Sequence, residues 1–420
     1  MPIEAISQTA LGPVYILSGN DDLNVGSGVT LLSQQNDAIL TFTGQHVITV
    51  SGLVMAYDDA INTMGCEAAQ TIEIKSGGVL LAGYTGAVED GDGVILDGVG
   101  SSLVNAGTII AKGSGLSLFV RDAGTTTITN SGFISGEKFG IWNKFGLGVL
   151  NVTNTGTIES PGAAFFGGAG IDNLTNEGSF VGDVRLNGGD DLYLGLGGSV
   201  LGSIEGGDGD DRFVVGLAAD VIDGGSGFDT LDFSASTSAL VIDLADGTNN
   251  HGGGTLGDSY SAIEGVIGGT KADVLRGDGA DNRLSGRNGS DRLEGGDGQD
   301  TLTGGTGGDM LIGGAGADVF EFLASGEVRD VITDFESGLD IIRIEGAAVG
   351  FGTTTGSLAT ERFHSGTSNA AEDALDRFIF NTADTTLWFD KDGSGSKFAS
   401  VLVADLQAGA WLTAASIELI

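Results

Sequence analysis

The chain contains a single cysteine, Cys66, and only three prolines and three histidines among its 420 residues. One cysteine excludes an intramolecular disulfide, and we expect Cys66 to be a small buried apolar residue. The scarcity of histidine and the absence of an HExxH pattern exclude the common zinc-protease site. No run of apolar residues is long enough for a membrane span, so the sequence predicts no membrane insertion.

Basic residues are also scarce, because 18 lysines and arginines stand against 57 aspartates and glutamates, a formal net charge of −39. Nucleic acids and anionic membrane surfaces are bound by clustered basic residues. The composition therefore predicts that nucleic acid is not a partner. The acids are unevenly distributed, since residues 181–420 hold 40 acids and 13 bases whereas residues 1–180 hold 17 acids and 5 bases.

Glycine is abundant, at 76 residues, and 40% of the chain is hydrophobic. The glycines do not follow the period of collagen, and the apolar runs are short and strand-like, as in Val47-Ile48-Thr49-Val50. Frequent glycine turns between short strands, with enough apolar residues for a continuous core, are typical of a β-solenoid.

One nine-residue pattern repeats without interruption over residues 268–321. Its eighth position is always large and apolar, from Leu275 to Phe320. Its first position is always glycine, namely Gly268, Gly277, Gly286, Gly295, Gly304 and Gly313. Its sixth position is an acid or an amide, namely Asp273, Asn282, Asp291, Asp300, Asp309 and Asp318.

Two such repeats predict one flattened coil, with a short strand on each face and a turn at each edge. Coil stacking then places Asp273, Asp291 and Asp309 along one edge, and Asn282, Asp300 and Asp318 along the other. Carboxylates one strand spacing apart, about 4.8 Å, repel strongly unless a hard cation lies between them. Calcium accepts carboxylate and backbone carbonyl oxygens together, and glycine lets such carbonyls converge. The pattern predicts several calcium ions, held by these side chains and by the turns that begin at the first-position glycines.

Two further copies lie upstream, at residues 206–214 and 224–232. They begin at Gly206 and Gly224, and their aspartates, Asp211 and Asp229, are one coil apart and should share an edge. A degenerate copy at residues 186–194 offers Asp191, but its glycine pattern is poor. Residues 233–267 are predicted to be a spacer that forms a coil with a loop bulging from one edge.

The pattern GGxGxDxUx resembles the RTX (haemolysin-type) calcium-binding nonapeptide repeat. The resemblance implies a calcium-loaded β-roll in a secreted, extracellular protein, either free or associated with the cell surface, exported by type I secretion machinery through an uncleaved C-terminal signal. Residues 1–20 agree with that route, because they lack the basic and apolar regions of a cleaved signal peptide.

Two segments after the array resemble C-terminal elements of the same family. Residues 330–342 resemble its capping strand pair, which implies that Asp330, Asp334 and Asp340 supply side chains to the last calcium turns. Residues 387–395 resemble its YDxDGxG hairpin, in which Asp390 and Asp392 either bind a further ion or form an ordinary acidic turn without metal.

A slower repeat of the form N-x-G-T-I precedes residue 186, with its asparagine at Asn105, Asn130, Asn154 and Asn176. Its spacing predicts a solenoid with one β-turn-β unit per coil. We expect the asparagines to stack as a hydrogen-bonded ladder rather than to act as ligands. This half resembles right-handed parallel β-helices of the autotransporter and polysaccharide-lyase type.

The predicted fold class is therefore all-β. A right-handed parallel β-helix is expected over residues 1–185, a calcium-binding β-roll over residues 186–325, and a β-rich C-terminal cap with the type I secretion region over residues 326–420.

The predicted function is that of a secreted calcium-binding structural or adhesive protein of a surface layer, a matrix or cell attachment, which folds on binding calcium outside the cell. Besides calcium and the type I secretion machinery, the expected partners are cell-surface polysaccharide or further copies of the chain. The alternative is a polysaccharide-active enzyme, a lyase or epimerase, with its site within residues 50–165. A deep groove lined with acids and with lysine or arginine favours the enzyme, and ordered arrays in calcium favour the structural role.

Within residues 50–165, Lys138, Trp142 and Lys144 form either a sugar-contacting patch or an edge loop. Asp58-Asp59 and Asp90-Gly91-Asp92-Gly93 are predicted to be solvated turns, and the alternative for the second segment is that it holds a calcium ion.

Overall fold

The computed structural model describes residues 2–84, 90–119, 123–195, 197–216, 220–252, 257–322, 329–345, 355–395 and 397–420. The chain forms two compact units, Met1–Asp229 and Thr230–Ile420. Regular structure in the described residues is strand apart from three short 3₁₀ helices, which confirms the all-β fold class. Over these same ranges, no helix has the length and apolar character needed to cross a membrane.

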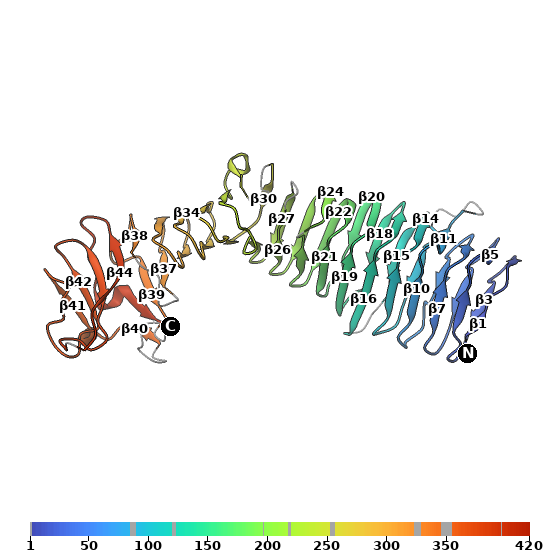
Figure 1. The fold of residues 1–420 in the computed structure, drawn as a ribbon, viewed down its shortest axis with the longest axis horizontal. Coiled ribbons are helices and arrows are strands. Elements are labelled where there is room, and N and C mark those ends of the chain that lie inside the picture. The colour runs from blue at the N-terminus through green and yellow to red at the C-terminus, as the bar shows by residue number, and fades with distance from the viewer. Residues whose placement is uncertain are drawn as a thin grey trace. The chain divides into compact units, whose positions relative to one another are not determined.

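The first unit is a parallel β-helix whose strands lie side by side in successive coils (Figure 1). One row of strands forms a continuous parallel ladder. It consists of β1 (Ile3–Glu4), β4 (Leu23–Val25), β7 (Val47–Val50), β10 (Thr71–Ile74), β13 (Ser102–Asn105), β16 (Thr125–Asn130), β19 (Val149–Asn154), β21 (Asp172–Asn176), β23 (Leu192–Leu194) and β26 (Arg212–Val214).

The remaining strands of this unit form a second and a third row, which the long strands β20 (Thr157–Phe166) and β22 (Ser179–Gly188) join. The second row also contains β2 (Gln8–Ala10), β5 (Thr30–Ser33), β8 (Leu53–Met55), β11 (Val79–Ala82), β14 (Thr108–Ala111), β17 (Phe133–Gly136) and β24 (Ser199–Leu201). The third row contains β3 (Tyr15–Leu17), β6 (Ile39–Thr41), β9 (Ile61–Asn62), β12 (Val94–Leu96), β15 (Ser114–Leu118), β18 (Phe139–Asn143), β25 (Ile204–Asp208) and β27 (Val221–Ser226). The prediction of one β-turn-β unit per coil was therefore wrong, since each complete early coil has room for three strands.

The core of the first unit is built from columns of inward side chains that stack from coil to coil. In the first row the parallel register aligns Ile48, Ile72 and Leu103, all of them fully buried. The same column continues through Ile128, Val152, Leu174, Tyr193 and Phe213. Removing such apolar surface from water stabilises the fold by roughly 25 cal/mol per Å².

Next to this column lies the ladder of asparagines that the sequence predicts. The side-chain amide N–H of Asn105 donates to Asn130 Oδ1 (2.8 Å), Asn130 donates to Asn154 (2.8 Å), and Asn154 donates to Asn176 (3.1 Å). The last amide, that of Asn176, donates to the hydroxyl of Tyr193 (3.3 Å). All four asparagines are fully buried, so the prediction of a hydrogen-bonded ladder is confirmed.

The second unit contains two sheets that face each other across the repeat array. The first consists of β28 (Thr230–Asp232), β31 (Gly265–Ile267), β33 (Arg283–Ser285), β35 (Thr301–Thr303), β37 (Val319–Phe322), β39 (Ile341–Ile344), β45 (Ile417–Leu419) and β40 (Gly356–Ser357). The second consists of β29 (Val241–Asp243), β32 (Val274–Arg276), β34 (Arg292–Asp297), β36 (Met310–Ala315), β38 (Asp330–Ile332), β44 (Val401–Leu406), β43 (Thr386–Phe389), β42 (Phe378–Asn381) and β41 (Phe363–Gly366). The other short elements are β30 (Ser259–Ser261), η1 (Gly247–Asn249), η2 (Thr360–Arg362) and η3 (Ala414–Ser416).

Each nonapeptide of the array contributes one strand that contains its eighth residue. Successive repeats alternate between the two sheets, so Leu275 aligns with Leu293 and Leu311 in one, and Leu284 aligns with Leu302 in the other. These side chains are fully buried between the sheets. The flattened coil of two repeats predicted from the sequence is confirmed.

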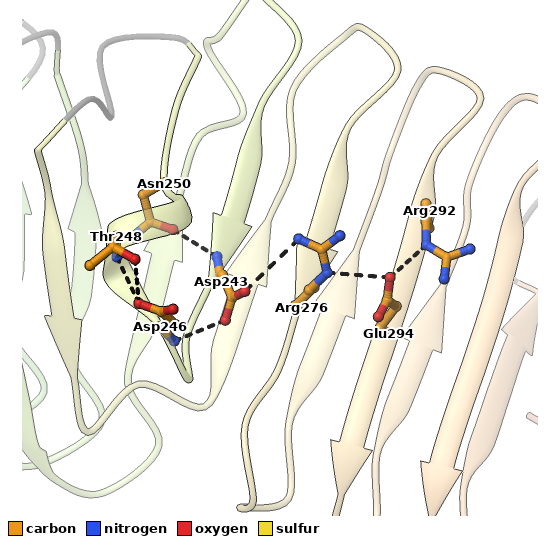
Figure 2. A network of polar contacts seen from close by, with 7 residues as sticks. All are labelled: Asp243, Asp246, Thr248, Asn250, Arg276, Arg292 and Glu294. Carbon is orange, nitrogen blue, oxygen red and sulfur yellow. Dashed lines mark hydrogen bonds and ion pairs between the residues drawn. The ribbon is translucent and has the colours of Figure 1, made fainter.

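The spacer of residues 233–267 joins the array through alternating charges on the outer face of the second sheet (Figure 2). Arg276 lies between Asp243 and Glu294 in the register of the strands, at 3.9 Å from Asp243 Oδ2 and 3.3 Å from Glu294 Oε1. Asp243 is held in turn by Asn250 of the spacer loop, whose side-chain oxygen accepts its backbone N–H (2.7 Å). The spacer thus forms a coil with its own loop, of which residues 253–256 lie outside the described ranges.

Beyond the array, the chain returns to extend both sheets. Strand β44 pairs in parallel with β38, and β45 pairs in parallel with β39. Strands β42, β43 and β44 then form an antiparallel meander. The division at residues 185 and 325 stays a prediction, since the border between the compact units lies at residue 229 and residue 325 is outside the described ranges.

Replacing Asn130 with alanine should destabilise the first unit. The change removes the partner of one amide N–H of Asn105 and of the side-chain oxygen of Asn154, both deep in the core. A buried polar group without its partner costs about 1–3 kcal/mol, so we expect the free energy of unfolding to fall by about 3 kcal/mol. Denaturant titration followed by circular dichroism in excess calcium measures the change.

The matched control is Asn151→Ala, on the outward side of the strand that carries Asn154. Its partner Asn173 (3.0 Å) is partly exposed and can bond water instead, so we expect a loss below about 1 kcal/mol. Equal losses in the two variants would show that the ladder has no special role.

Candidate calcium-binding turns

The turns between the strands of the array are tight enough to require glycine. Gly316 has a φ of +149°, and a β-carbon built on it would lie 1.6 Å from the carbonyl oxygen of Gly298 in the preceding coil. A larger residue at this point would separate the coils. The GGxGxD sequence thus brings successive turns into direct contact, and the aspartate that ends each turn is carried into the interior.

Along one edge of the second unit, sixth-position aspartates form a ladder through the backbone. The N–H of Asp273 donates to Asp291 Oδ1 (2.8 Å), and that of Asp291 donates to Asp309 Oδ1 (2.7 Å). The ladder ends when the N–H of Asp309 donates to Asp330 Oδ1 (2.9 Å). The edge predicted from the sequence is therefore present, and Asp330 extends it by one coil.

The opposite edge has the same construction. The N–H of Asn282 donates to Asp300 Oδ1 (2.8 Å), and that of Asp300 donates to Asp318 Oδ1 (3.0 Å). Asp340 completes this ladder by accepting the N–H of Asp318 (3.0 Å). The structure thus brings together the residues that the spacing assigned to each edge.

A third ladder lies in the first unit and is longer than the sequence predicted. The N–H of Asp191 donates to Asp211 Oδ1 (2.8 Å), and that of Asp211 donates to Asp229 Oδ1 (2.8 Å). Asp191, which the poor glycine pattern left open, is therefore a full member. Asp172 precedes it, with its N–H donated to Asp191 Oδ1 (2.7 Å), and was missed by the sequence analysis. The signal that was available is spacing, because Asp172 lies one coil length before Asp191 although no GGxGxD surrounds it.

The second carboxylate oxygens indicate that these ladders are ligand sites. Each Oδ1 is used by the adjacent coil, whereas several buried Oδ2 atoms have no hydrogen-bond partner among the described residues. Leaving a buried carboxylate oxygen in this state is costly unless a cation or a proton accompanies it. The Oδ2 atoms concerned belong to Asp191, Asp211, Asp291, Asp300, Asp309, Asp318 and Asp330.

Backbone oxygens converge on the same points. A β-carbon built on Gly295 would lie 2.2 Å from Asp300 Oδ2 and 2.5 Å from the carbonyl oxygen of Gly313. At Gly206 the corresponding distances are 2.2 Å to Asp211 Oδ2 and 2.3 Å to the carbonyl oxygen of Gly224. The space that glycine leaves therefore holds a carboxylate oxygen and a carbonyl oxygen from successive coils. The same convergence occurs at Gly268, with the carbonyl of Gly286, and at Gly286, with that of Gly304.

This donor set fits calcium, which prefers oxygen ligands and accepts carboxylates and carbonyls together. The residues present would hold each ion with the Oδ2 of a sixth-position aspartate and glycine carbonyls of the turns. A bound ion would supply the positive charge that the buried carboxylates lack.

The electrostatics of the ladders agree with a cation-binding site. Burial raises the pKa of Asp291, Asp300 and Asp330 to about 7, although a backbone N–H donated to each carboxylate opposes the shift. Burial also raises the pKa of Asp191 to about 8 and that of Asp211 to about 6. Without metal, these carboxyl groups therefore hold protons up to near-neutral pH.

Two predicted ligands differ from the rest. Asn282 is neutral, and its Oδ1 already accepts the N–H of Asp278 (2.8 Å). At this position of the ladder the side chain therefore provides calcium with less negative charge than an aspartate would. Asp334 lies over the last turn, where its two oxygens accept the N–H groups of Gly313 (3.0 Å) and Gly314 (2.8 Å). Its role as a ligand stays a prediction.

The hairpin with Asp390 and Asp392 lies apart from the ladders. The carboxylate of Asp392 accepts the N–H groups of Lys397 (2.9 Å) and Phe398 (3.3 Å), and the bond from Lys397 holds its pKa below the usual value. Asp390 accepts the N–H of Asp392 (3.1 Å). These contacts favour the ordinary acidic turn over the further ion, which stays a prediction.

Comparison with known families agrees with this geometry. The family model described as RTX calcium-binding nonapeptide repeat (4 copies) matches residues 203–231, 266–293 and 285–320. These ranges cover the two upstream repeats and the tandem array, apart from the last residue of each segment. The chain therefore carries RTX calcium-binding repeats, a type of repeat typical of secreted proteins, and calcium is the ion they bind. A search of curated proteins finds no match to the chain.

Replacing Asp300 with alanine should weaken two adjacent calcium sites, because Asp300 is shared by the rungs to Asn282 and Asp318. The parent should bind about five to ten ions, since each needs several oxygens from neighbouring coils. We expect the Asp300→Ala variant to bind about two fewer at the same calcium concentration. Native mass spectrometry counts the ions.

Asp297→Ala is the matched control, since Asp297 lies in the same repeat but its side chain is exposed. It should bind as many ions as the parent. Identical ion counts in all three proteins would contradict the shared-rung arrangement.

Calcium affinity should rise with pH. A raised carboxyl pKa means that the metal-free folded state binds more protons than the unfolded state between about pH 4 and pH 7, so its stability falls as pH rises through that window. Calcium must displace those protons, and binding should therefore be several-fold tighter at about pH 8 than at about pH 6. Calorimetric titration at the two pH values measures this, and equal affinities would mean that the ladder carboxyls are already ionised at pH 6.

Proposed function

We propose that this chain is an exported protein whose repeat array folds on binding calcium outside the cell, and whose role there is structural or adhesive. The observation that carries the proposal is the set of buried aspartate Oδ2 atoms beside converging glycine carbonyls. A cell interior offers calcium far below the millimolar range that suits weak extracellular sites. Inside the cell the ladders would thus lack the charge they need, and outside they would obtain it.

Folding after export also suits the position of the expected secretion signal. The last strand, β45, pairs with β39 on one side and with β40 on the other, and Ile417 is fully buried. A strand held in this way is inaccessible to a receptor. The type I secretion machinery would therefore read this region before the second unit folds.

A structural or adhesive role is supported by the regularity of the surface that the coils produce. Exposed acids repeat at coil spacing on the outside of the turns, as where the N–H of Asp210 donates to Asp190 Oδ1 (3.0 Å) and that of Gln299 donates to Asp281 Oδ1 (2.7 Å). Rows of this kind present the same chemistry at each step. Further copies of the chain, or polysaccharide on a cell surface, are the partners that such a repeating face would join.

Calcium should control folding of the second unit and of the last coils of the first unit in the full-length chain. In excess EGTA we expect proteases to cleave mainly after about residue 186, where the aspartate ladders lie, with the earlier coils protected by their neutral asparagine ladder. On adding calcium to about 1 mM, the cleavage sites should become protected together and β-structure should increase steeply, because binding stabilises only the folded form. Limited proteolysis with mass-spectrometric mapping, alongside circular dichroism, follows both changes.

Full β-structure and full protection in EGTA would contradict calcium-controlled folding. Electron microscopy of the same samples tests the role, since ordered arrays should appear only with calcium. Dispersed particles in both conditions would argue against it.

A further inference from the structure

A pocket of about 360 Å³ lies on the third strand row of the first unit, away from the calcium ladders. Acids line it from the turns before β9 and β12, and aromatic and basic side chains line it from β18 and its flanking turns. The volume is that of a small-ligand site. It also has the acids and lysines that distinguish a glycan-active site from a plain structural surface.

The acidic wall is ordered rather than solvated. Asp59 is only 6% exposed, and its carboxylate accepts the N–H of Asp92 (2.8 Å) and the side-chain amide of Asn62 (2.9 Å). Asp92 in turn accepts the N–H of Ser114 (2.6 Å). The prediction of solvated turns was therefore wrong for Asp59 and Asp92, because coil stacking carries them against the backbone of the next coil, whereas Asp90 is exposed as predicted.

This wall can both donate and accept hydrogen bonds. Burial is the main cause that raises the pKa of Asp59 to about 8, so its carboxyl group holds a proton at neutral pH. Asp58 lies beside it, is only half-buried and lines the pocket. Paired donor and acceptor oxygens of this kind match the hydroxyl groups of a sugar, each of which donates and accepts.

The opposite wall is a strip of aromatic rings on adjacent strands. Phe139 and Trp142 of β18 lie 5.3 Å apart between ring centroids, and Phe139 lies 5.1 Å from Phe166 of β20. The strand register places Trp142 next to Phe166 in the following coil. These rings are half-buried, so part of each remains accessible to solvent.

The basic residues complete this wall without making the pocket cationic. Lys138 forms an ion pair with Asp90, which neutralises its charge. The ammonium group of Lys144 lies 4.6 Å from the ring centroid of Trp142 and 4.9 Å from that of Phe119, a cation–π arrangement that fixes the rings. Of the two alternatives left open by the sequence, the contacts favour a patch built on a strand rather than an edge loop.

We propose that this pocket binds a pyranose unit of a neutral polysaccharide, with the sugar face packed on Trp142 and Phe139 and its hydroxyl groups bonded to Asp58 and Asp59. Acids outnumber lysines around the pocket, and residues 1–180 carry a formal charge of −12, so an acidic polysaccharide would be repelled. The chain of sugars would continue along the strip past Phe166, where Lys144, Phe145 and Leu147 line a second hollow. The site lies in the first unit alone and is independent of calcium-controlled folding.

Calorimetric titration of the full-length protein in calcium tests the proposal. The probes are neutral hexasaccharides (gluco-, xylo- and manno-configured) and, for comparison, hexagalacturonate. We expect at least one neutral probe to bind, with hexagalacturonate about tenfold weaker or undetected. Trp142→Ala should weaken the neutral probe about tenfold, whereas the control Trp411→Ala, which alters an equally large ring that is 53% exposed in the second unit, should leave it unchanged.

If Trp142→Ala lowers the circular dichroism signal, Asp58→Asn decides the question, since it keeps the shape of a half-exposed side chain and should weaken binding several-fold. The proposal is overturned if no neutral probe binds at about 10 mM, if only the galacturonate binds, or if the pocket variants bind like the parent. Repeating the titration in EGTA separates the two proposals, because sugar binding should persist there whether or not the second unit folds.

Discussion

The backbone hydrogen bond to Oδ1 of each sixth-position aspartate sets the register of the repeat coils and at the same time buries a charge. A carboxylate only accepts hydrogen bonds, so it can be bound by the N–H of the preceding coil but can offer nothing to the next side chain. Its Oδ2 is left beside a glycine carbonyl, which is also an acceptor, as where Asp300 Oδ2 and the carbonyl of Gly313 meet at Gly295. Two acceptors at one point need either a proton or a cation between them. A cation at that point converts the most unfavourable feature of the fold into the contact that joins its coils.

The asparagine ladder of the first unit shows what the same geometry does without charge. An amide both donates and accepts, so Asn130 bonds Asn105 on one side and Asn154 on the other, and the row satisfies itself. A ladder of asparagines is therefore satisfied within the polypeptide. A ladder of aspartates needs a bound cation to balance its charge. The chain uses both devices, and within the first unit the change occurs where Asn176 ends one ladder on Tyr193 and Asp191 continues the other.

How much of this could be read from the sequence depends on whether one short segment determines the geometry. The nonapeptide does, because its glycines, aspartate and apolar residue are all required within a single turn and strand, and so Asp300 could be assigned to its edge. Asp340 lies after the repeats and was assigned to the last turns only through the resemblance of residues 330–342 to a capping strand pair. Asp191 was only a candidate, because its turn lacks the glycines and its aspartate alone is a weak signal. The pocket could not be predicted in the same way. Asp59 and Trp142, which both line it, are 83 positions apart in the sequence, and they come together only because irregular coils stack in a register that no local pattern specifies.

The segment that follows the array completes its two aspartate ladders. The last rung of each ladder takes its carboxylate from the segment that follows the repeats, because Asp309 donates to Asp330 and Asp318 donates to Asp340. The strands that carry these two acids, or directly follow them, are the ones on which β44 and β45 complete the sheets. An ion bound at the last turns would therefore order β38 and β39, and with them the edges that the C-terminal strands require. We therefore expect calcium binding at the last turns to favour formation of the cap, because Asp330 and Asp340 connect the final rungs to the strands on which β44 and β45 pair.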